Sequence, residues 1–485
     1  MACEVKMETA TSINQATKNH LIAEGYDHPE VMNVVMKDGI SLSVPTNINL
    51  LTPYVLLEQG DWFEEEIDFV RSVIQPGNHV VDIGAKYGAY SLSAAKAAGS
   101  DGKVWAFEPG PATAAYLSRS ILLNQMNQVD VIAGCHAIPG GNTLILDDAM
   151  NRFGTTGIDF LKLDAEGLEQ DILNHGTVFL SQHSPLIQYR IKYNEHVNTD
   201  LISFFASVGY DSYRLVPGIG CLVPCPTVQG IDPYQLNLFC CKADRALHLE
   251  KKGLLIRREL MNETFGQTDP SLWIKHIRPF PYAMQLAKLW RNYLAENHAD
   301  PHWQAHQEAL SCYALSRIPH IGMAERIEAL NRAYLILKDT IDSHATFSRL
   351  MSFSRISMDL GFRAQAVVAL DRLVQMMGSD HLISIDEPFI PVLPRFESQD
   401  PGEKIGAWIL VSLLETRERY QSFSTYFSGN LSLKNLDLLK TLPFYHPDME
   451  QRRKMIHLRR SFETPEEPAG INPGITQTHC HENFS

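Results

Sequence analysis

The sequence predicts an α/β fold, with a doubly wound and mostly parallel sheet followed by a mostly α-helical C-terminal region. Three observations support this prediction. Apolar strand patterns alternate with amphipathic helix patterns between residues 79 and 245, which is typical of a parallel sheet. A glycine-containing turn, residues 84–88, joins the first of these strands to a helix. From about residue 246 the strand patterns fade and helical stripes take over.

The composition describes a globular chain with more than one hydrophobic core. The chain has 485 residues, of which 45% are hydrophobic, and its formal net charge is -14. A chain of this length usually divides into about two or three domains. It shows no signal peptide, no run of the ~20 apolar residues that a membrane span needs, and no basic stretch suited to nucleic acid. We therefore expect no nucleic-acid partner and no membrane span, and the scattered cysteines favour a cytoplasmic location.

Four regions follow from the changes in pattern. They are a lead-in with a hairpin (1–53), a sheet-containing domain (54–245), a helical domain (246–463) and a disordered tail (464–485). Asp38-Gly39 between alternating apolar residues predicts the hairpin. The tail is rich in Pro, Glu and polar residues. Similar Ala/Leu/Arg patterns recur in the helical domain without a clear repeat consensus, so a bundle and a helical repeat both remain open.

The remaining elements are predicted in chain order. Residues 54–57 suggest a short strand, and Asp61 to Glu64 suggest a capping box before a helix whose apolar stripe runs to Ile74. In the sheet-containing domain we expect strands near 79–82, 104–108, 129–133, 158–163 and 186–191, an antiparallel pair at 213–216 and 236–240, and helices near 90–98, 111–125, 166–174 and 201–208. The segment 134–157 is less regular, with a possible strand at 143–146 and a short helix at 147–153. In the helical domain we expect helices near 282–297, 303–316, 323–338, 345–360, 363–377, 403–418 and 433–439.

The stretch from His79 to Tyr90 carries the strongest functional signal. Its strand contains Asp82, its turn contains Gly84 and Gly88, and the next strand ends at Glu108. A strand, a glycine loop, a helix and a second strand ending in an acid are the layout that binds an adenosine ligand. The spacing Gly84-x-x-x-Gly88 lacks the middle glycine of a dinucleotide motif, which favours S-adenosylmethionine. On these residues alone, a strand-turn-helix without any ligand remains the alternative.

Several ordered motifs make residues 54–245 resemble the FkbM family of S-adenosylmethionine-dependent methyltransferases. The matching segments are Asp61-Trp62-Phe63-Glu64, Val81-Asp82-Ile83-Gly84-Ala85, Trp105-Ala106-Phe107-Glu108-Pro109 and Phe160-Leu161-Lys162-Leu163-Asp164-Ala165-Glu166-Gly167. The resemblance implies a class I methyltransferase fold with S-adenosylmethionine as the cofactor. It also implies methylation of a hydroxyl on a sugar, glycan or natural-product-like small molecule.

The resemblance assigns roles to residues at the strand ends. Asp82 is expected to hold the glycine loop or the methionine amino group, and Glu108 to hold the ribose. The expected cofactor site comprises Asp82, Gly84, Ala85, Lys86, Tyr87, Gly88, Glu108 and Pro109. Asp164 is the candidate base or metal ligand, and the alternative is a carboxylate that only caps the following helix. The cysteine spacings predict no metal site of their own.

Three features depart from the family pattern. Lys86 stands where the family loop carries Asn, residues 134–157 form a shorter connection than usual, and Arg190 stands where this branch carries Glu. The shorter connection and Arg190 motivate an alternative function, in which a catalytically impaired methyltransferase fold serves as a binding or scaffold module. A protein partner would then bind through the helical region.

Overall fold

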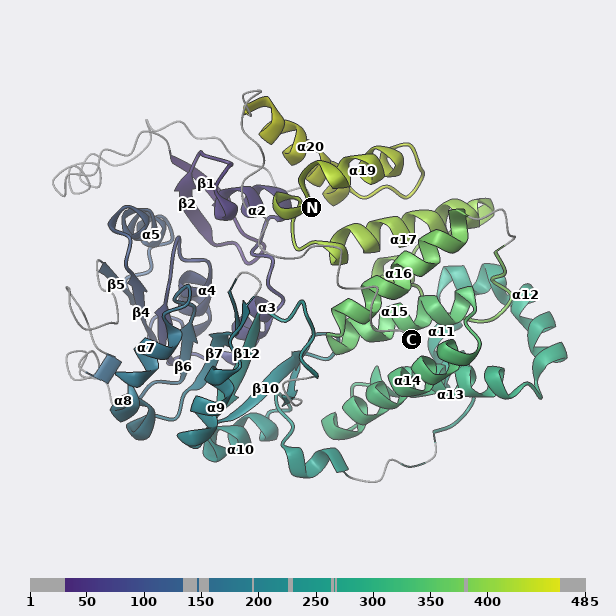
Figure 1. Ribbon diagram of the computed structural model, residues 1–485, viewed down its shortest axis with the longest axis horizontal. Coiled ribbons are helices and arrows are strands. Elements are labelled where there is room, and N and C mark those ends of the chain that lie inside the picture. Colours follow the sequence, from purple (N-terminus) through teal and green to yellow (C-terminus); the bar gives the residue numbers. More distant parts are fainter. Residues whose placement is uncertain are drawn as a thin grey trace.

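The computed structural model describes residues 31–133, 146–147, 157–193, 196–225, 230–262, 266, 268–378 and 383–462. A sheet-containing half lies on the left of Figure 1 and a helical half on the right. The last helices, α19 (Leu433–Lys440) and α20 (Pro447–Phe462), lie at the top beside the N-terminal elements. The lead-in before residue 31, most of the strand predicted at 143–146, most of the helix predicted at 147–153 and the predicted tail lie outside the described residues, while residues 146 and 147 are helical.

An eight-stranded sheet forms the first half, and its strand order is β11-β10-β12-β7-β6-β3-β4-β5. Its strands are β3 (His79–Ile83), β4 (Lys103–Glu108), β5 (Val129–Ala133), β6 (Phe160–Leu163), β7 (Leu186–Arg190), β10 (Asp211–Val216), β11 (Cys221–Pro224) and β12 (Asn237–Cys241). Strands β3 to β7 run parallel, whereas β10, β11 and β12 pair antiparallel. The predicted parallel sheet with an antiparallel pair at its end is confirmed, and β11 extends it.

Both faces of the sheet are covered by helices, which explains the continuous apolar strands. Neighbouring residues of β3 point to opposite faces, so Val80 belongs to one core and Val81 to another. One face packs against α3 (Glu66–Val73), α4 (Ala89–Ala98) and α10 (Ala243–Lys251). The other packs against α7 (Glu169–Asn174), α8 (Thr177–Gln182) and α9 (Asp200–Ser207). Helix α5 (Pro111–Leu123) packs against β5 and against the hairpin strand β2.

The predicted hairpin is present as β1 (Val31–Val35) and β2 (Ser41–Pro45), which turn at Gly39 with φ +84°. A second short ribbon joins β8 (Lys192–Tyr193) to β9 (His196–Val197). The strand predicted at 54–57 is wrong. Those residues lie in helix α2 (Leu51–Gln59), which ends at Gly60 in a left-handed conformation. A short apolar run that is buried on all sides has no periodicity that would distinguish a strand from a helix.

The predicted capping box before α3 is also wrong. Helix α3 begins at Glu66, and its N-cap residue Glu65 makes no side-chain capping bond. Asp61 instead accepts two hydrogen bonds from Arg71, each of 2.8 Å. Glu64 turns into the protein, where its carboxylate meets Tyr90 and Arg190. The motif therefore joins elements distant in the sequence, because paired and buried partners satisfy these carboxylates better than solvent-exposed backbone does.

The helical half is built from successive antiparallel helices. They are α11 (Leu272–Ile277), α12 (Pro281–Asn297), α13 (Pro301–Ser316), α14 (Met323–Ser343), α15 (Phe347–Leu360), α16 (Arg363–Gly378), α17 (Ile405–Gln421) and α18 (Thr425–Ser428), with a 3-10 turn η6 (Gly429–Ser432) before α19. Each of α13 to α16 packs on the next along the chain, and α17 packs on α19, around a core that includes the buried Trp303 and Trp408. Among the described residues, no helix combines the length and apolar character needed to cross a membrane.

The two halves touch directly where β10 meets α15. The amide of Gly218 donates to the carbonyl of Asp359 at 2.9 Å, and a Cβ at Gly218 would lie 2.4 Å from the Asp359 side chain. Only glycine permits this approach. Nearby, the guanidinium of Arg214 donates to the carbonyl of Leu360.

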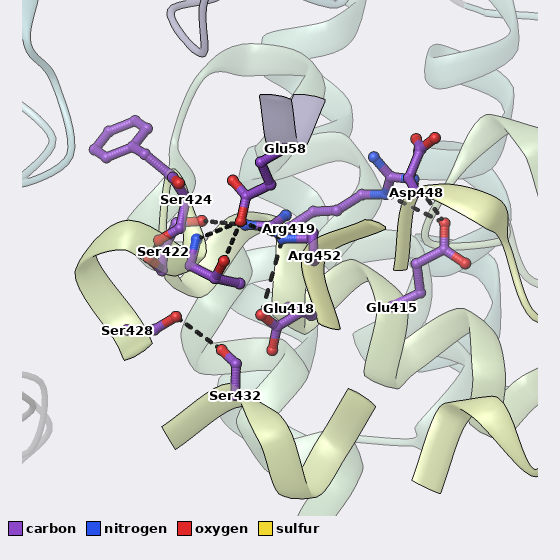
Figure 2. A network of polar contacts seen from close by, with 12 residues as sticks. Glu58, Glu415, Glu418, Arg419, Ser422, Ser424, Ser428, Ser432, Asp448 and Arg452 are labelled. Carbon is purple, nitrogen blue, oxygen red and sulfur yellow. Dashed lines mark hydrogen bonds and ion pairs between the residues drawn. The ribbon is translucent and has the colours of Figure 1, made fainter. Parts of the chain in front are cut away.

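A second junction ties α2 to the end of the chain, and Figure 2 shows its polar contacts. The carboxylate of Glu58 accepts from the backbone amide of Thr425 at 2.8 Å and from its hydroxyl. Arg452 of α20 lies between Glu58 and Glu418, with Nε 3.8 Å and 4.0 Å from their oxygens. The residues just after α17 are thus fixed against the sheet-containing half.

Candidate active site

The loop after β3 has a backbone that glycine makes possible. Gly84 has φ +82°, and a Cβ there would lie 1.9 Å from the carbonyl oxygen of Asp164. The amides of Gly84 and Ala85 both donate to the carbonyl of Phe107 at 3.0 Å. Gly88, with φ +95°, packs instead against Leu117, where a Cβ would lie 2.5 Å from the leucine methyl. The strand ends of β3, β4 and β6 are therefore locked together, as the sequence predicted for a parallel sheet.

Glu108 holds this loop in place. Its carboxylate accepts from the amide of Lys86 at 2.8 Å and from the amide of Gly110 at 2.9 Å. Burial raises the pKa of Glu108, while the two amide bonds act in the opposite direction. Each oxygen keeps a further lone pair, so a ribose hydroxyl can still donate to it.

Lys86 has a left-handed backbone with φ +50°, a conformation that Asn tolerates better than Lys does. Its ammonium lies 2.6 Å from Glu166, and both side chains are about half exposed. Glu166 itself has φ +54° and precedes Gly167 with φ +99°. The lysine is thus paired across the loops that follow β3 and β6.

A cavity of about 1080 Å³ opens beside these loops, between the two halves. Its wall on the sheet side includes Asp82, Gly84, Ala85, Lys86, Tyr87, Tyr90, Lys162, Asp164 and Arg190. Its opposite wall comes from α16, α17, α18, η6 and α19, and includes Val367, Val374, Phe423, Phe427 and Leu431. A volume of this size suits a drug-sized molecule or larger.

Charged side chains gather at the sheet end of the cavity. Lys162 lies 3.7 Å from Asp82 and 3.4 Å from Asp164, and its side chain is 6% exposed. Burial alone would lower the pKa of Lys162, but the two carboxylates raise it. Burial raises the pKa of Asp82, whose Oδ2 accepts from Ser91 at 2.5 Å. Its Oδ1 is buried and has no hydrogen-bond partner among the described residues.

Arg190 extends this cluster toward α3. Its Nη1 lies 3.5 Å from Asp164 and 3.1 Å from Glu64, and Tyr90 donates to Glu64 at 2.8 Å. Burial would raise the pKa of Asp164, yet the charges of Lys162 and Arg190 lower it to about 2. Asp164 is therefore a fully ionised and weakly basic carboxylate. Among the described residues, no group of three or more His, Cys, Asp or Glu is placed to hold a metal ion.

The structure brings most of the predicted site residues to the cavity. Those that line it are Asp82, Gly84, Ala85, Lys86, Tyr87 and Asp164, whereas Gly88, Glu108 and Pro109 are not part of its lining. Sequence reasoning did not place Tyr90 in the site or connect Glu64 to it. It also missed the wall from the helical half, because no motif in that half indicates which helix faces the sheet.

A comparison with protein-family models agrees with the resemblance. Residues 141–212 match the model of the methyltransferase FkbM domain. A search of curated proteins finds no match. Similar solved structures include a SAM-dependent O-methyltransferase from Thermotoga maritima (13% identity, 46% of this chain and 96% of that chain, TM-score 0.26). They also include a SAM-dependent methyltransferase from Aquifex aeolicus (13% identity, 39% of this chain and 92% of that chain, TM-score 0.25). A third is a human methyltransferase 10 domain containing protein (14% identity, 42% of this chain and 89% of that chain, TM-score 0.29).

The predicted family resemblance is confirmed by the matched segment. That segment ends just inside β10 and contains β6, with Lys162 and Asp164, and β7, with Arg190. The predicted fold class is confirmed by the strand order and by the helices on both faces of the sheet. The first half of the chain therefore has the doubly wound α/β fold that the sequence predicted, and within it residues 141–212 are similar to the FkbM methyltransferase domain.

Proposed function

We propose that the protein is an S-adenosylmethionine-dependent O-methyltransferase acting on a hydroxyl of a sugar or natural-product-like small molecule. The observation that carries the proposal is the glycine loop after β3 opening onto the cavity between the halves. We place the reaction in the cytoplasm, in keeping with the free cysteines among the described residues.

The residues around the loop fit this cofactor. The buried Oδ1 of Asp82 makes no hydrogen bond among the described residues and faces Lys162 at 3.7 Å, so a closer ammonium group such as that of the methionine moiety would supply a donor. Glu108 keeps acceptor capacity for ribose hydroxyls next to the loop. When bound, S-adenosylmethionine supplies a methyl group carried on a positively charged sulfur. The chain's part is to hold the acceptor oxygen in line with that methyl and to exclude water.

The helical half then serves as the acceptor wall. Its helices supply the side of the cavity that faces the glycine loop, and the junctions at Gly218 and Glu58 fix it there. This arrangement gives the helical half a role in the reaction itself. It supports an enzyme over the alternative of an impaired fold that binds a protein partner.

Calorimetric titration with S-adenosylmethionine tests the proposal. We expect binding by the full chain and at least about tenfold weaker binding by Glu108→Gln, because the amide replaces an acceptor by a donor. Asp130→Asn is the matched control, since Asp130 forms a surface ion pair with Lys103 on the neighbouring strand. No binding by the wild-type chain would overturn the function, and an unchanged affinity of Glu108→Gln would remove the ribose role.

A further inference from the structure

The sheet end of the cavity offers cationic donors that the protein leaves unused. Arg190 uses Nη1 for the two carboxylates and Nε for the carbonyl of Lys192, while Nη2 has no hydrogen-bond partner among the described residues. Among the described residues, Lys162 makes one hydrogen bond, to Asp164 at 3.4 Å, although an ammonium has three donors. It also faces Asp82 at 3.7 Å and the ring of Tyr90 at 5.0 Å. Both side chains line the cavity. This end of the cavity can therefore bind an oxygen atom that accepts hydrogen bonds from both Arg190 and Lys162.

Every carboxylate that lines the cavity among the described residues faces a cation. Asp82 lies 3.7 Å from Lys162, and Glu418 on the opposite wall lies 4.0 Å from Arg452. Asp164 is held between Lys162 and Arg190, and the first carboxylate beyond it, Glu166, is paired with Lys86 at 2.6 Å. Across the cavity, Asp371 is paired with Arg417 at 2.5 Å. No histidine occurs among the described residues that line the cavity. A carboxylate whose pKa two cations lower to about 2 takes up a proton too weakly to activate an alcohol.

An acceptor that ionises without a strong base suits this end of the cavity. An aliphatic alcohol ionises near the pKa of water, roughly 16, and needs a strong base or a metal to react. A phenol ionises near about 10, and an adjacent cation lowers such a pKa by a further ~1–3 units. An oxygen of this kind becomes an anion between Arg190 and Lys162 without help from a protein base.

The middle of the cavity is suited to an aromatic body. Trp62 and Phe63 from the sheet-containing half meet Phe423 and Phe427 from the helical half, with Phe63 ring centroids 5.3 Å from Phe423 and 6.2 Å from Phe427. All four line the cavity and are only partly buried, so their exposed surfaces face it. Aromatic rings prefer offset or edge-to-face neighbours, and a flat ring system fits among them.

Within the proposed methyltransferase function, we propose that the acceptor presents a phenol-type hydroxyl on an aromatic ring system. Arg190 and Lys162 hold its oxygen as the phenolate, and Asp164 positions these two cations. The phenolic proton passes to water on binding. The oxygen then forms a bond to the methyl carbon while the carbon–sulfur bond breaks, and sulfur keeps the electron pair. The negative charge of the oxygen and the positive charge of the sulfonium cancel, so no base is needed.

Binding of 4-nitrophenol tests this inference apart from activity, because its phenolate absorbs visible light. We expect the full chain, saturated with S-adenosylhomocysteine, to lower the apparent pKa of bound 4-nitrophenol by at least about one unit. Arg190→Gln should abolish that shift, and Arg190→Lys should restore part of it, because Lys keeps the charge but loses the planar fork. Thermal unfolding of each variant shows whether it is folded.

Arg372→Gln is the matched control. Arg372 lines the same cavity from α16, is exposed and has no ion pair among the described residues, so the shift should persist. An unshifted or raised pKa of 4-nitrophenol, an absence of binding at millimolar concentration, or an equal loss in Arg372→Gln would overturn the inference. If S-adenosylmethionine still binds in that case, the proposed function stands and only the acceptor class fails.

Discussion

Two clusters of buried charged side chains differ in one respect, which is whether they open onto a cavity. The cluster of the sheet-containing half, around Lys162 and Asp164, lines the cavity. The cluster of the helical half, around His306 and Glu387, is sealed, and these two side chains are 0% and 5% exposed. Both join acids to cations, so composition alone does not distinguish them, although the pairs of the sealed cluster are shorter.

The sealed cluster is held together by its own members, although Nδ1 of His306 makes no well-aligned hydrogen bond among the described residues. Glu387 lies 2.8 Å and 2.7 Å from two nitrogens of Arg349, 2.9 Å from Nδ1 of His306, and 2.6 Å from the hydroxyl of Thr346. Ser352 lies 3.4 Å from Nε2 of His306, so serine, histidine and glutamate stand in the order of a hydrolase triad. The Ser352 hydroxyl, however, donates to the carbonyl of Ser348 and is fully buried, so no substrate can reach it.

The difference teaches how to separate a structural cluster from a functional one. In the open cluster, Oδ1 of Asp82 and Nη2 of Arg190 have no hydrogen-bond partner among the described residues. A buried polar atom left in this state costs about 1–3 kcal/mol unless a ligand or water satisfies it. The open cluster is therefore less stabilising but can bind a ligand, whereas the sealed cluster stabilises the fold and cannot bind one.

The largest expected effect comes from the sealed cluster. Glu387→Gln should lower the free energy of unfolding by about 3–5 kcal/mol, because it leaves the 1% exposed Arg349 without its charge partner. The affinity for S-adenosylmethionine should not change. Denaturant unfolding and calorimetry measure the two quantities. Glu308→Gln is the control, since its ion pair with Arg332 is over 40% exposed and should contribute at most about 1 kcal/mol.

The same variant has a defined dependence on pH. Burial would raise the pKa of Glu387, but His306 and Arg349 lower it to about 2. Because this pKa lies below the unfolded value of about 4.3, the stabilisation is fully present above pH ~4.3 and is lost as the pH falls toward 2. The difference in stability between wild type and Glu387→Gln should shrink over that range. A constant difference would show that the charge of Glu387 is not the cause.

A smaller loss of stability is expected in the open cluster. Asp164→Asn should lower the free energy of unfolding by about 1–2 kcal/mol, because Lys162 still faces Asp82 and Arg190 still faces Glu64. The shift in the pKa of bound 4-nitrophenol should become smaller, since the variant keeps both cations but removes the carboxylate that positions them. A loss of stability as large as that of Glu387→Gln would contradict the distinction between the clusters.

The sequence predicted those parts of the fold that depend on local pattern and alternation. The strand ending before Gly84 and the helix after Gly88 are where the motif puts them, because the loop needs glycine at both places. Prediction failed at residues 54–57 and at Asp61, where tertiary contacts decide the outcome. Helix α20 was not foreseen as an element, and its packing against α2 has no local signal.

The candidate site was predictable only on its sheet side. Asp82 and Asp164 follow from the rule that parallel strands gather their carboxyl ends at one edge. The pairing of Arg190 with both Glu64 and Asp164 could not be read from the sequence, because it joins three separate elements. Phe423 and Phe427 reach the cavity only because the chain after α17 is held against α2, and that contact spans more than 360 residues.

The smallest change in stability is expected at the exposed edge of the open cluster, where Lys86 pairs with Glu166. Lys86→Asn removes the pair with Glu166, whose side chains are 42% and 60% exposed, and such pairs contribute little. Asn also tolerates the left-handed backbone at φ +50° better than Lys does, so the free energy of unfolding should stay within about 0.5 kcal/mol of wild type. Because Lys86 lines the cavity beside the glycine loop, the affinity for S-adenosylmethionine should change although stability does not. Calorimetry and denaturant unfolding on the same preparation measure both. A variant altered in stability but not in affinity would mean that the Lys86 pair belongs with the sealed, structural contacts.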